Sequence, residues 1–324
     1  MAELTMAAGN ATARRRKFSW ARIPGAAYML VILAVVFAFT TQGFTNSENL
    51  VNIGMQSTIL LLLALPMTLI IMTEGVDLSV GAVLTFACVI FAAVVVKTGS
   101  LPLALGAGVA IGLVFGVVNG ILIANLDIPP FVTTLGTMGV AQGLALVVTD
   151  GQSITGIPDS VVFYYAGTFA GVPMCILIAA GVYLLTHWLL YHTRFGTYVF
   201  ALGGNAEALR LAGVKVKLYL VGVYAFGGLL AGLGALLLTA RMNAGHPTAA
   251  LGMEFDAIAG VALGGTSFEK GNGWLFGTLL GVLLVGVLRN GLNLLGVQSA
   301  VQVATVGLLV MVALLIDAFK GTAR

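Results

Sequence analysis

Long apolar segments without charge are the feature that most constrains this chain. A helix crosses the hydrocarbon core of a bilayer with about 20 residues. The runs lack strict two-residue alternation, and residues 59–65 are apolar on every side, so helices are favoured over the strands of a closed barrel. The sequence therefore predicts an all-α polytopic membrane protein. Its uncharged runs extend over 23–47, 49–73, 78–96, 98–126, 218–240 and 290–316.

Composition excludes an ordinary soluble domain. The 324 residues are 59% hydrophobic and 8% charged, whereas soluble proteins carry about 25% charged residues. The 43 glycines suit a bundle whose helices pack through small residues. One group of glycines lies largely on one face of a single segment, where a neighbouring backbone is expected to approach closely: Gly106, Gly108, Gly112, Gly116 and Gly120.

We expect about ten transmembrane helices in a single permease-like domain, 23–324, after a basic tail, 1–22. The apolar run after Arg14–Lys17 is too long for a signal peptide, so it is read as a retained first helix. The eighth helix is too short to span comfortably and is expected to be broken or re-entrant. The predicted helices are 23–41, 51–72, 78–96, 101–124, 131–148, 171–191, 218–240, 256–268, 274–295 and 299–318.

The distribution of basic residues predicts the orientation. With ten crossings and a cytoplasmic N-terminus, both termini are cytoplasmic, and only Lys97 and Arg241 fall outside. Connection 149–170 is then external, and connection 192–217 is cytoplasmic. Arg289 falls within a helix. The cytoplasmic side receives Arg14, Arg15, Arg16, Lys17, Arg22, Arg194, Arg210, Lys215, Lys217, Lys270, Lys320 and Arg324.

No enzyme constellation is visible in the sequence. The three histidines are scattered without metal-ligand spacing, and no metal or cofactor is expected in this chain. The stretch Gly264–Gly273 lacks the lysine followed by Ser or Thr that a phosphate-binding loop requires. If transport is driven by ATP, the ATPase must be a separate protein.

The cytoplasmic connection contains a short amphipathic helix. A turn precedes a cap-like Asn205, and a glycine ends the helix. Two interpretations remain open from spacing alone: the helix docks in the groove of a partner protein, or it lies on the membrane surface. The residues that define this segment are Gly203, Asn205, Glu207, Ala208, Leu209, Arg210 and Gly213.

Five blocks, in order, resemble the permease subunits of ATP-driven importers of the ribose/xylose/arabinose type, over about 49–320. In the cytoplasmic segment, Glu207, Ala208 and Gly213 match the family's Glu-Ala-Ala, three residues, Gly coupling pattern, and Leu209 replaces the second Ala. Glu74 replaces a usual Gly, and 268–271 departs from the family's Gly-Gly pair. The blocks are 74–81, 129–138, the coupling segment, 263–267 and 289–297.

The resemblance implies a permease of the bacterial inner membrane that moves a small sugar or sugar-like polyol. It also implies three protein partners: an ATPase subunit that binds ATP and Mg²⁺, an external substrate-binding protein that docks on loops such as 149–170, and a second permease copy, identical or different. Membrane lipids surround the bundle, and no nucleic acid is expected. ATP binding would move the coupling segments and switch the pathway between outward and inward access.

Asp77 has two interpretations. It is either a hydrogen-bond acceptor for sugar hydroxyls or a cap for the helix that follows, and the cap is favoured. Other polar side chains in apolar segments either line the pathway or bond neighbouring helices, and Arg289 pairs with Glu254 or Asp256, or extends outward. The candidate pathway residues are Asp77, Ser79, Asn119, Phe131, Thr134, Thr137, Asn290 and Asn293.

Three alternatives remain. An ion-coupled secondary transporter would use Glu74 and Asp77 as proton sites. A membrane-embedded enzyme is disfavoured because catalytic groups lack a convincing spacing. A related importer would carry nucleosides or branched-chain amino acids. An internal repeat is also expected, because GVDLSVG and GGTSFEKGNG each precede a glycine-rich helix.

Overall fold

The computed structural model describes residues 25–267 and 271–322. The described chain is a bundle of helices with one two-stranded antiparallel hairpin. The predicted tail 1–22 and residues 268–270 of the predicted repeat lie outside the described residues. The elements are α1 (Gly25–Thr40), α2 (Ser47–Met72), α3 (Val80–Thr98), α4 (Leu101–Leu126), α5 (Pro130–Thr149), α6 (Asp159–Ala166), β1 (Thr168–Phe169), β2 (Val172–Pro173), α7 (Met174–His192), α8 (Arg194–Leu211), α9 (Val216–Met242), α10 (Met253–Leu263), α11 (Leu275–Leu294) and α12 (Ser299–Thr322).

Seven of the described helices are long and apolar enough to cross a membrane: α2, α3, α4, α5, α7, α9 and α11. The all-α polytopic class is therefore confirmed, but the count of ten crossings is not. α1 has 16 residues, and α10 has 11, fewer than the roughly 20 residues that a crossing needs. The expectation that the eighth predicted helix is short agrees with α10.

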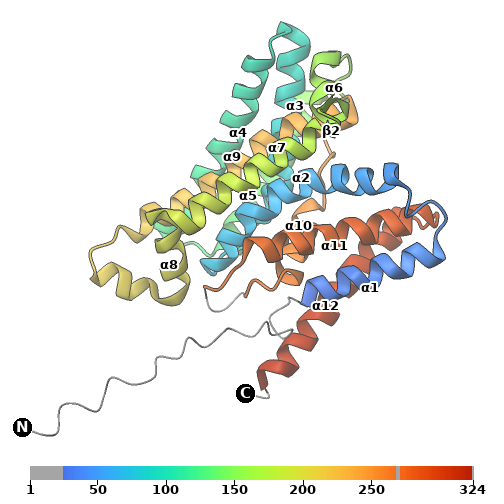
Figure 1. Ribbon diagram of the computed structural model, residues 1–324. Helices are drawn as coiled ribbons and strands as arrows, with labels where there is room; N and C mark the ends of the chain where they lie inside the picture. The colour runs from blue at the N-terminus through green and yellow to red at the C-terminus, as the bar shows by residue number, and fades with distance from the viewer. Residues whose placement is uncertain (1–24, 268–270, 323–324) are drawn as a thin grey trace, which may run out of the picture.

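Both long connections contain more regular structure than the sequence predicted. The connection 149–170 holds α6 and β1, and its Ile154 exchanges backbone hydrogen bonds with Gly245 in the loop after α9. The connection 192–217 holds the 18-residue α8. Figure 1 shows α8 at one end of the bundle, and α6 with the hairpin at the other, joined by α7.

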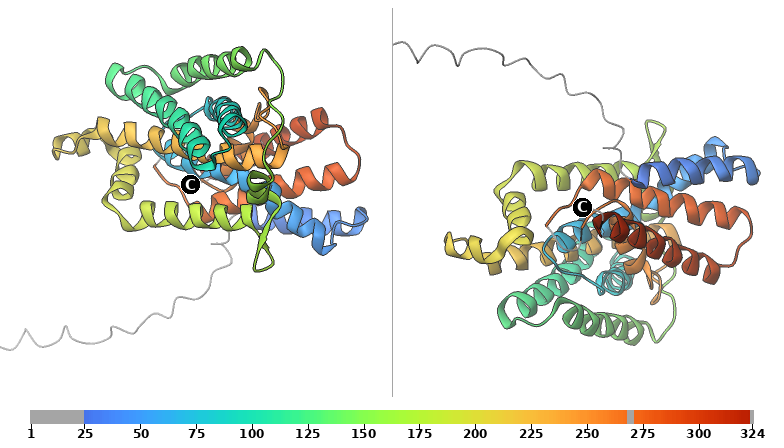
Figure 2. Two further views of the ribbon diagram at one scale, coloured as in Figure 1. Left: turned by 90° about the horizontal axis from the view of Figure 1, so that it is seen from above. Right: turned by 90° about the horizontal axis from the view of Figure 1, so that it is seen from below.

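The helices are arranged in groups around the central α2. The two views in Figure 2 place α4 and α5 on one side, and α1, α11 and α12 on another. α2 lies between them and is buried on every side from Ser57 to Met72. A helix that is apolar all round is suited to such a central position. Inside this core, the Thr68 and Thr278 hydroxyls share a 2.7 Å hydrogen bond between α2 and α11.

α4 packs against α9 through glycines on both helices. A Cβ atom at Gly112 would collide with the carbonyl of Gly228, and one at Gly116 would collide with the carbonyl of Tyr224. The expected close approach is therefore confirmed, and the neighbour is α9. Gly106 was wrongly included in this contact, because no atom lies within 4 Å of a Cβ built there. The glycines let the two backbones touch, which larger side chains would prevent.

Candidate functional site

α8 is interrupted at Asn205, where φ is −165° and ψ is 90°. The Asn205 side-chain oxygen accepts a hydrogen bond from the Ala208 N–H at 2.8 Å, the bond that an N-cap makes. The following helix stops before Gly213, whose φ is +80°, and the Val214 N–H bonds to the Leu209 carbonyl at 3.1 Å. A left-handed glycine is a common helix end. The predicted cap and stop are therefore confirmed.

The segment between these signals, 206–212, presents an exposed mixed surface. Ala208 and Leu211 are exposed, Leu211 to 79%, whereas Leu209 is half-buried. Glu207 and Arg210 form an ion pair of 2.6 Å on the same surface. Two hydrogen bonds from Arg210 hold the pKa of Glu207 below its usual value. Small and apolar side chains beside one ion pair form a surface suited to a partner protein.

Gly203, three residues before this segment, is packed against the bundle. Gly203 is buried, and a Cβ atom there would collide with the Met72 carbonyl at the end of α2 and with the Cα of Gly271. Only a glycine allows this backbone contact. α8 therefore consists of a packed part up to Gly203, a break at Asn205 and a free part after it (Figure 1). The buried contact of Gly203 joins the packed part of α8 to the end of α2.

A buried polar cluster follows the end of α2. Asp77 Oδ1 accepts the Ser79 N–H at 2.8 Å and the Ser79 hydroxyl at 2.6 Å. The Asn119 amide of α4 donates to the Ser79 hydroxyl at 2.9 Å. All three residues are buried. Asp77 therefore bonds the amides at the start of α3, as expected for a cap, although Ser79 rather than Asp77 occupies the N-cap position.

Two buried polar atoms lie at or near this cluster without a hydrogen-bond partner among the described residues. They are Asn119 Oδ1 and the Tyr224 hydroxyl of α9. The space beside Asp77, Ser79 and Asn119 is too small for a water molecule. A pathway through this cluster would therefore require α3, α4 and α9 to move apart. Tyr224 was not singled out from the sequence, because a tyrosine in an apolar run carries no local functional signal.

α5 contributes three of the predicted pathway residues, in different settings. The Thr134 hydroxyl lies 3.4 Å from the Val76 carbonyl, beside Asp77, and bonds to the Pro130 carbonyl at 2.9 Å. The Thr137 hydroxyl bonds within α5 to the Thr134 carbonyl at 3.2 Å. Phe131 is exposed in the first turn of α5. Of these, Thr134 lies closest to the cluster through its contact with Val76.

The two predicted residues of α11 lie elsewhere. Asn290 exchanges two side-chain hydrogen bonds with Asn49, near the start of α2, at 2.9 and 3.0 Å. Asn293 is exposed in the last turn of α11. Because Asp77 follows the opposite end of α2, the structure does not bring Asn290 and Asn293 to the Asp77 cluster. Asn290 has the geometry of a contact between helices, the alternative that the sequence left open.

The comparisons with known proteins extend over nearly the whole chain. Residues 49–316 match the family described as branched-chain amino acid transport system / permease component. The ribose import permease protein of Bacillus subtilis is 40% identical over 293 residues, 90% of this chain and 91% of that protein. The D-allose and L-arabinose transport system permease proteins of Escherichia coli are each 33% identical, covering 90% and 96% of both chains. No solved structure matches.

The fold and these matches define the class of protein. It is a multi-pass membrane protein and a transport permease rather than an enzyme. The chain belongs to the branched-chain amino acid transport system / permease component family. The resemblance on which the sequence analysis relied is thereby confirmed.

Proposed function

We propose that the chain is the membrane-spanning subunit of an ATP-driven importer that carries a small sugar or sugar-like polyol across the bacterial inner membrane. The observation that carries the proposal is the similarity, over at least 90% of this chain, to permeases named for ribose, allose and arabinose. The three named cargoes share a compact, neutral, polyhydroxylated structure. The family description also names branched-chain amino acids, so leucine is the informative competing cargo.

The ATPase docks on residues 206–212, and ATP with Mg²⁺ binds in that separate subunit. The exposed Leu211 and Ala208 fit an apolar groove, while Glu207 and Arg210 lie at its rim. The buried contact of Gly203 with the Met72 carbonyl passes the motion to α2. Since residue 77 follows α2 by five positions, the Asp77 cluster is the first polar part of the bundle to respond.

The orientation follows from the basic residues. Arg194, Arg210, Lys215 and Lys217 lie in or beside α8, and this concentration of positive charge favours a cytoplasmic position for α8. The hairpin and α6 then face outward, at the end of the bundle where an external binding protein would dock (Figure 1). A second permease copy, identical or different, packs beside this one to complete the pathway.

The experiment begins with gentle solubilisation of native membranes and identification of the proteins that co-purify. The purified assembly is placed in vesicles with ATP on the ATPase side and its external binding protein on the opposite side. Uptake of labelled ribose, allose, arabinose and leucine is then compared. We expect an ATPase to co-purify and one monosaccharide to enter only with ATP. A homo-oligomer that takes up solute without ATP would instead support the secondary transporter. ATP-dependent uptake of leucine alone would support an amino-acid importer.

A further inference from the structure

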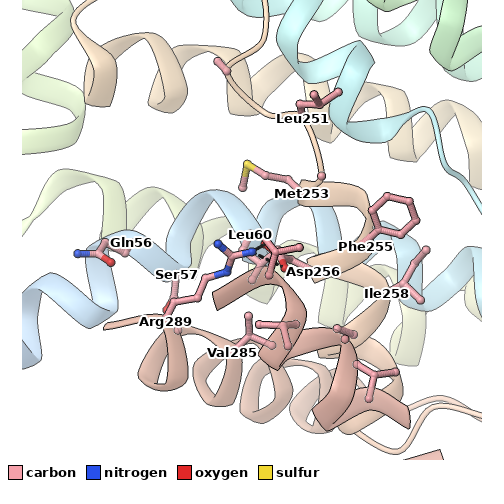
Figure 3. A pocket seen from close by; sticks show the side chains of 18 of the residues that line it. Gln56, Ser57, Leu60, Leu251, Met253, Phe255, Asp256, Ile258, Val285 and Arg289 are labelled. Carbon is pink, nitrogen blue, oxygen red and sulfur yellow. Dashed lines mark hydrogen bonds and ion pairs between the residues drawn. The ribbon is translucent and has the colours of Figure 1, made fainter. Parts of the chain in front are cut away.

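A cavity of about 590 Å³ with a largely apolar wall lies between α2, α10, α11 and α12, and none of the predicted pathway residues lines it. Its size falls within the roughly 300–1,000 Å³ typical of small-molecule sites. The polar and aromatic part of its wall comprises Gln56, Ser57, Arg241, Phe255, Asp256 and Arg289. We call it the Arg289 cavity (Figure 3).

The Arg289 cavity lies in the half of the bundle away from α8. Gln56 and Ser57 are in the first half of α2, whereas the other end of α2, Met72, contacts Gly203 of α8. Arg241 is in the last turn of α9, the helix that starts directly after the α8 connection. In the proposed orientation, the cavity therefore faces the outer side of the membrane, where a cargo enters first.

An ion pair forms the centre of the wall. Arg289 on α11 lies 2.6 Å from Asp256 on α10, and their side chains are 32% and 11% exposed. In Figure 3 the two side chains point toward one another and meet. Charged residues cost about 2.5–3.5 kcal/mol at the centre of a bilayer, so those that occur there mostly face a partner or a polar pathway. Here they do both.

The wall also offers unused hydrogen-bonding capacity. Arg289 Nε is buried and has no hydrogen-bond partner among the described residues. The Ser57 hydroxyl donates to the Ile53 carbonyl at 2.7 Å, so its oxygen can still accept. Gln56 adds an amide, which both donates and accepts. The Arg289 side chain as a whole is 32% exposed and carries five N–H donors, of which one on the terminal nitrogen bonds Asp256 at 2.8 Å.

These groups can hydrogen-bond a polyol, which a lipid chain cannot match. The charges of Arg289 and Asp256 cancel within their ion pair, and the exposed Arg241 leaves the wall with one positive charge. A sugar hydroxyl both donates and accepts, so neighbouring hydroxyls can serve Arg289 and Asp256 together. Phe255, 60% exposed, offers an aromatic surface to the apolar face of a sugar ring. An acyl chain offers no hydrogen-bonding group to Gln56, Asp256 or Arg289.

The start of α10 connects the cavity to the Asp77 cluster. Phe255 and Asp256 face the Arg289 cavity, while the adjacent Glu254 packs against Gly81 of α3. One residue before the cavity-lining Leu251, the Ala250 N–H bonds to the Thr85 hydroxyl of α3 at 3.1 Å. α3 is the helix that follows Asp77. The cavity and the cluster therefore lie on opposite sides of residues 250–256.

We infer that the Arg289 cavity holds a neutral polyol during transport, with Arg289, Asp256 and Gln56 as its hydrogen-bonding groups and Phe255 against its ring. The inference rests on the proposed sugar import and names a site within it. In that function, cargo passes from the external side into this cavity before residues 250–256 and the Asp77 cluster separate.

The first test uses two equal substitutions on neighbouring residues of α2. Leu60 lines the Arg289 cavity, whereas Leu61 faces an apolar crevice formed with α7 and α11. In the complete importer in vesicles, with the monosaccharide that the wild type carries, Leu60→Phe is expected to lower the sugar moved per ATP hydrolysed at least fivefold. Leu61→Phe should stay within twofold of the wild type. Equal ratios for the two variants would overturn the inference.

The second test measures access and is independent of transport. Gln56→Cys and Leu184→Cys are treated with a hydrophilic thiosulfonate reagent in vesicles that contain the assembled protein. Leu184 is 65% exposed but lines the apolar crevice, and the native Cys88 and Cys175 are buried. We expect Gln56→Cys to react at least tenfold faster, and ribose, allose or arabinose to slow that reaction.

The outcomes separate the two proposals. If the wild type carries no sugar with its ATPase and its external binding protein, the proposed function fails, while the thiol reactions still decide whether the cavity admits water and polyol. If Gln56→Cys is no more reactive than Leu184→Cys, or no sugar slows it, the cavity is not the polyol site even in a working importer. A cavity filled by lipid would likewise leave Gln56→Cys unreactive or its reaction unaffected by sugar.

Discussion

The side-chain oxygen of Asn205 accepts the Ala208 N–H at 2.8 Å in the middle of α8. This one bond separates the part of α8 that is packed on the bundle from the exposed helix that follows. An asparagine cap contributes about 0.5–2 kcal/mol relative to alanine. The position of the break is thus encoded by a single side chain, and it defines which residues are free to meet a partner.

Removal of that cap should weaken the exposed helix. Asn205→Ala is expected to cost about 1 kcal/mol of local stability, and to raise amide hydrogen exchange over 206–211 about fivefold. Asn205→Asp keeps an acceptor oxygen and should exchange like the wild type. The measurement is hydrogen exchange read by mass spectrometry on the solubilised protein. Equal exchange in all three proteins would mean that packing, not the cap, holds the helix.

Reversal of the charge at Glu207 should uncouple transport from ATP hydrolysis. Glu207→Arg removes the 2.6 Å ion pair with Arg210 and places two cations on the proposed docking surface. We expect normal insertion, binding of the ATPase weakened at least tenfold, and loss of sugar uptake. Glu48→Arg, an exposed glutamate at the start of α2, is the matched control and should retain uptake. Normal uptake by Glu207→Arg would refute the docking assignment.

The cap and the stop of the exposed helix were predictable because both signals are local. Asn205 bonds three residues ahead, and Gly213 adopts a left-handed conformation that favours glycine. The preceding part of α8 was missed for the opposite reason. Its burial depends on Gly203 meeting the Met72 carbonyl, a contact across more than 100 residues that leaves no periodic pattern in the sequence.

The candidate pathway was predicted as one set, and the structure divides it. Each polar residue in an apolar run is visible in the sequence, but its neighbours depend on which helices pack together. Asn119 meets Ser79 because α4 packs on α3. Asn290 meets Asn49 because α11 packs on α2. Arg289 was expected to pair with Glu254 or Asp256, and the structure selects Asp256.

Because α4 and α9 pack through glycines, a glycine-to-alanine substitution should have opposite effects on stability at two positions of α4. In a helix, alanine is more favourable than glycine by about 1 kcal/mol. Gly106→Ala should therefore raise the stability of the protein by up to that amount, because no atom lies within 4 Å of a Cβ built there. At Gly112 the new Cβ would collide with the Gly228 carbonyl, and overpacking costs about 1–3 kcal/mol. Thermal unfolding in detergent should therefore show Gly112→Ala below the wild type and Gly106→Ala at or above it. The same shift in both variants would contradict the packing.

Asp77 distinguishes an ATP-driven importer from a proton-coupled transporter. Its Oδ1 accepts the Ser79 N–H and hydroxyl, and an asparagine oxygen can accept the same two bonds without exchanging a proton. Asp77→Asn should therefore retain at least a third of the wild-type uptake, whereas Asp77→Leu leaves the Ser79 N–H unpaired and should lose most of it. Uptake is measured in vesicles supplied with ATP, with and without a protonophore, which should change neither the wild type nor Asp77→Asn. If Asp77→Asn is inactive although correctly inserted, and the protonophore abolishes wild-type uptake, the carboxylate carries protons and the importer assignment is wrong.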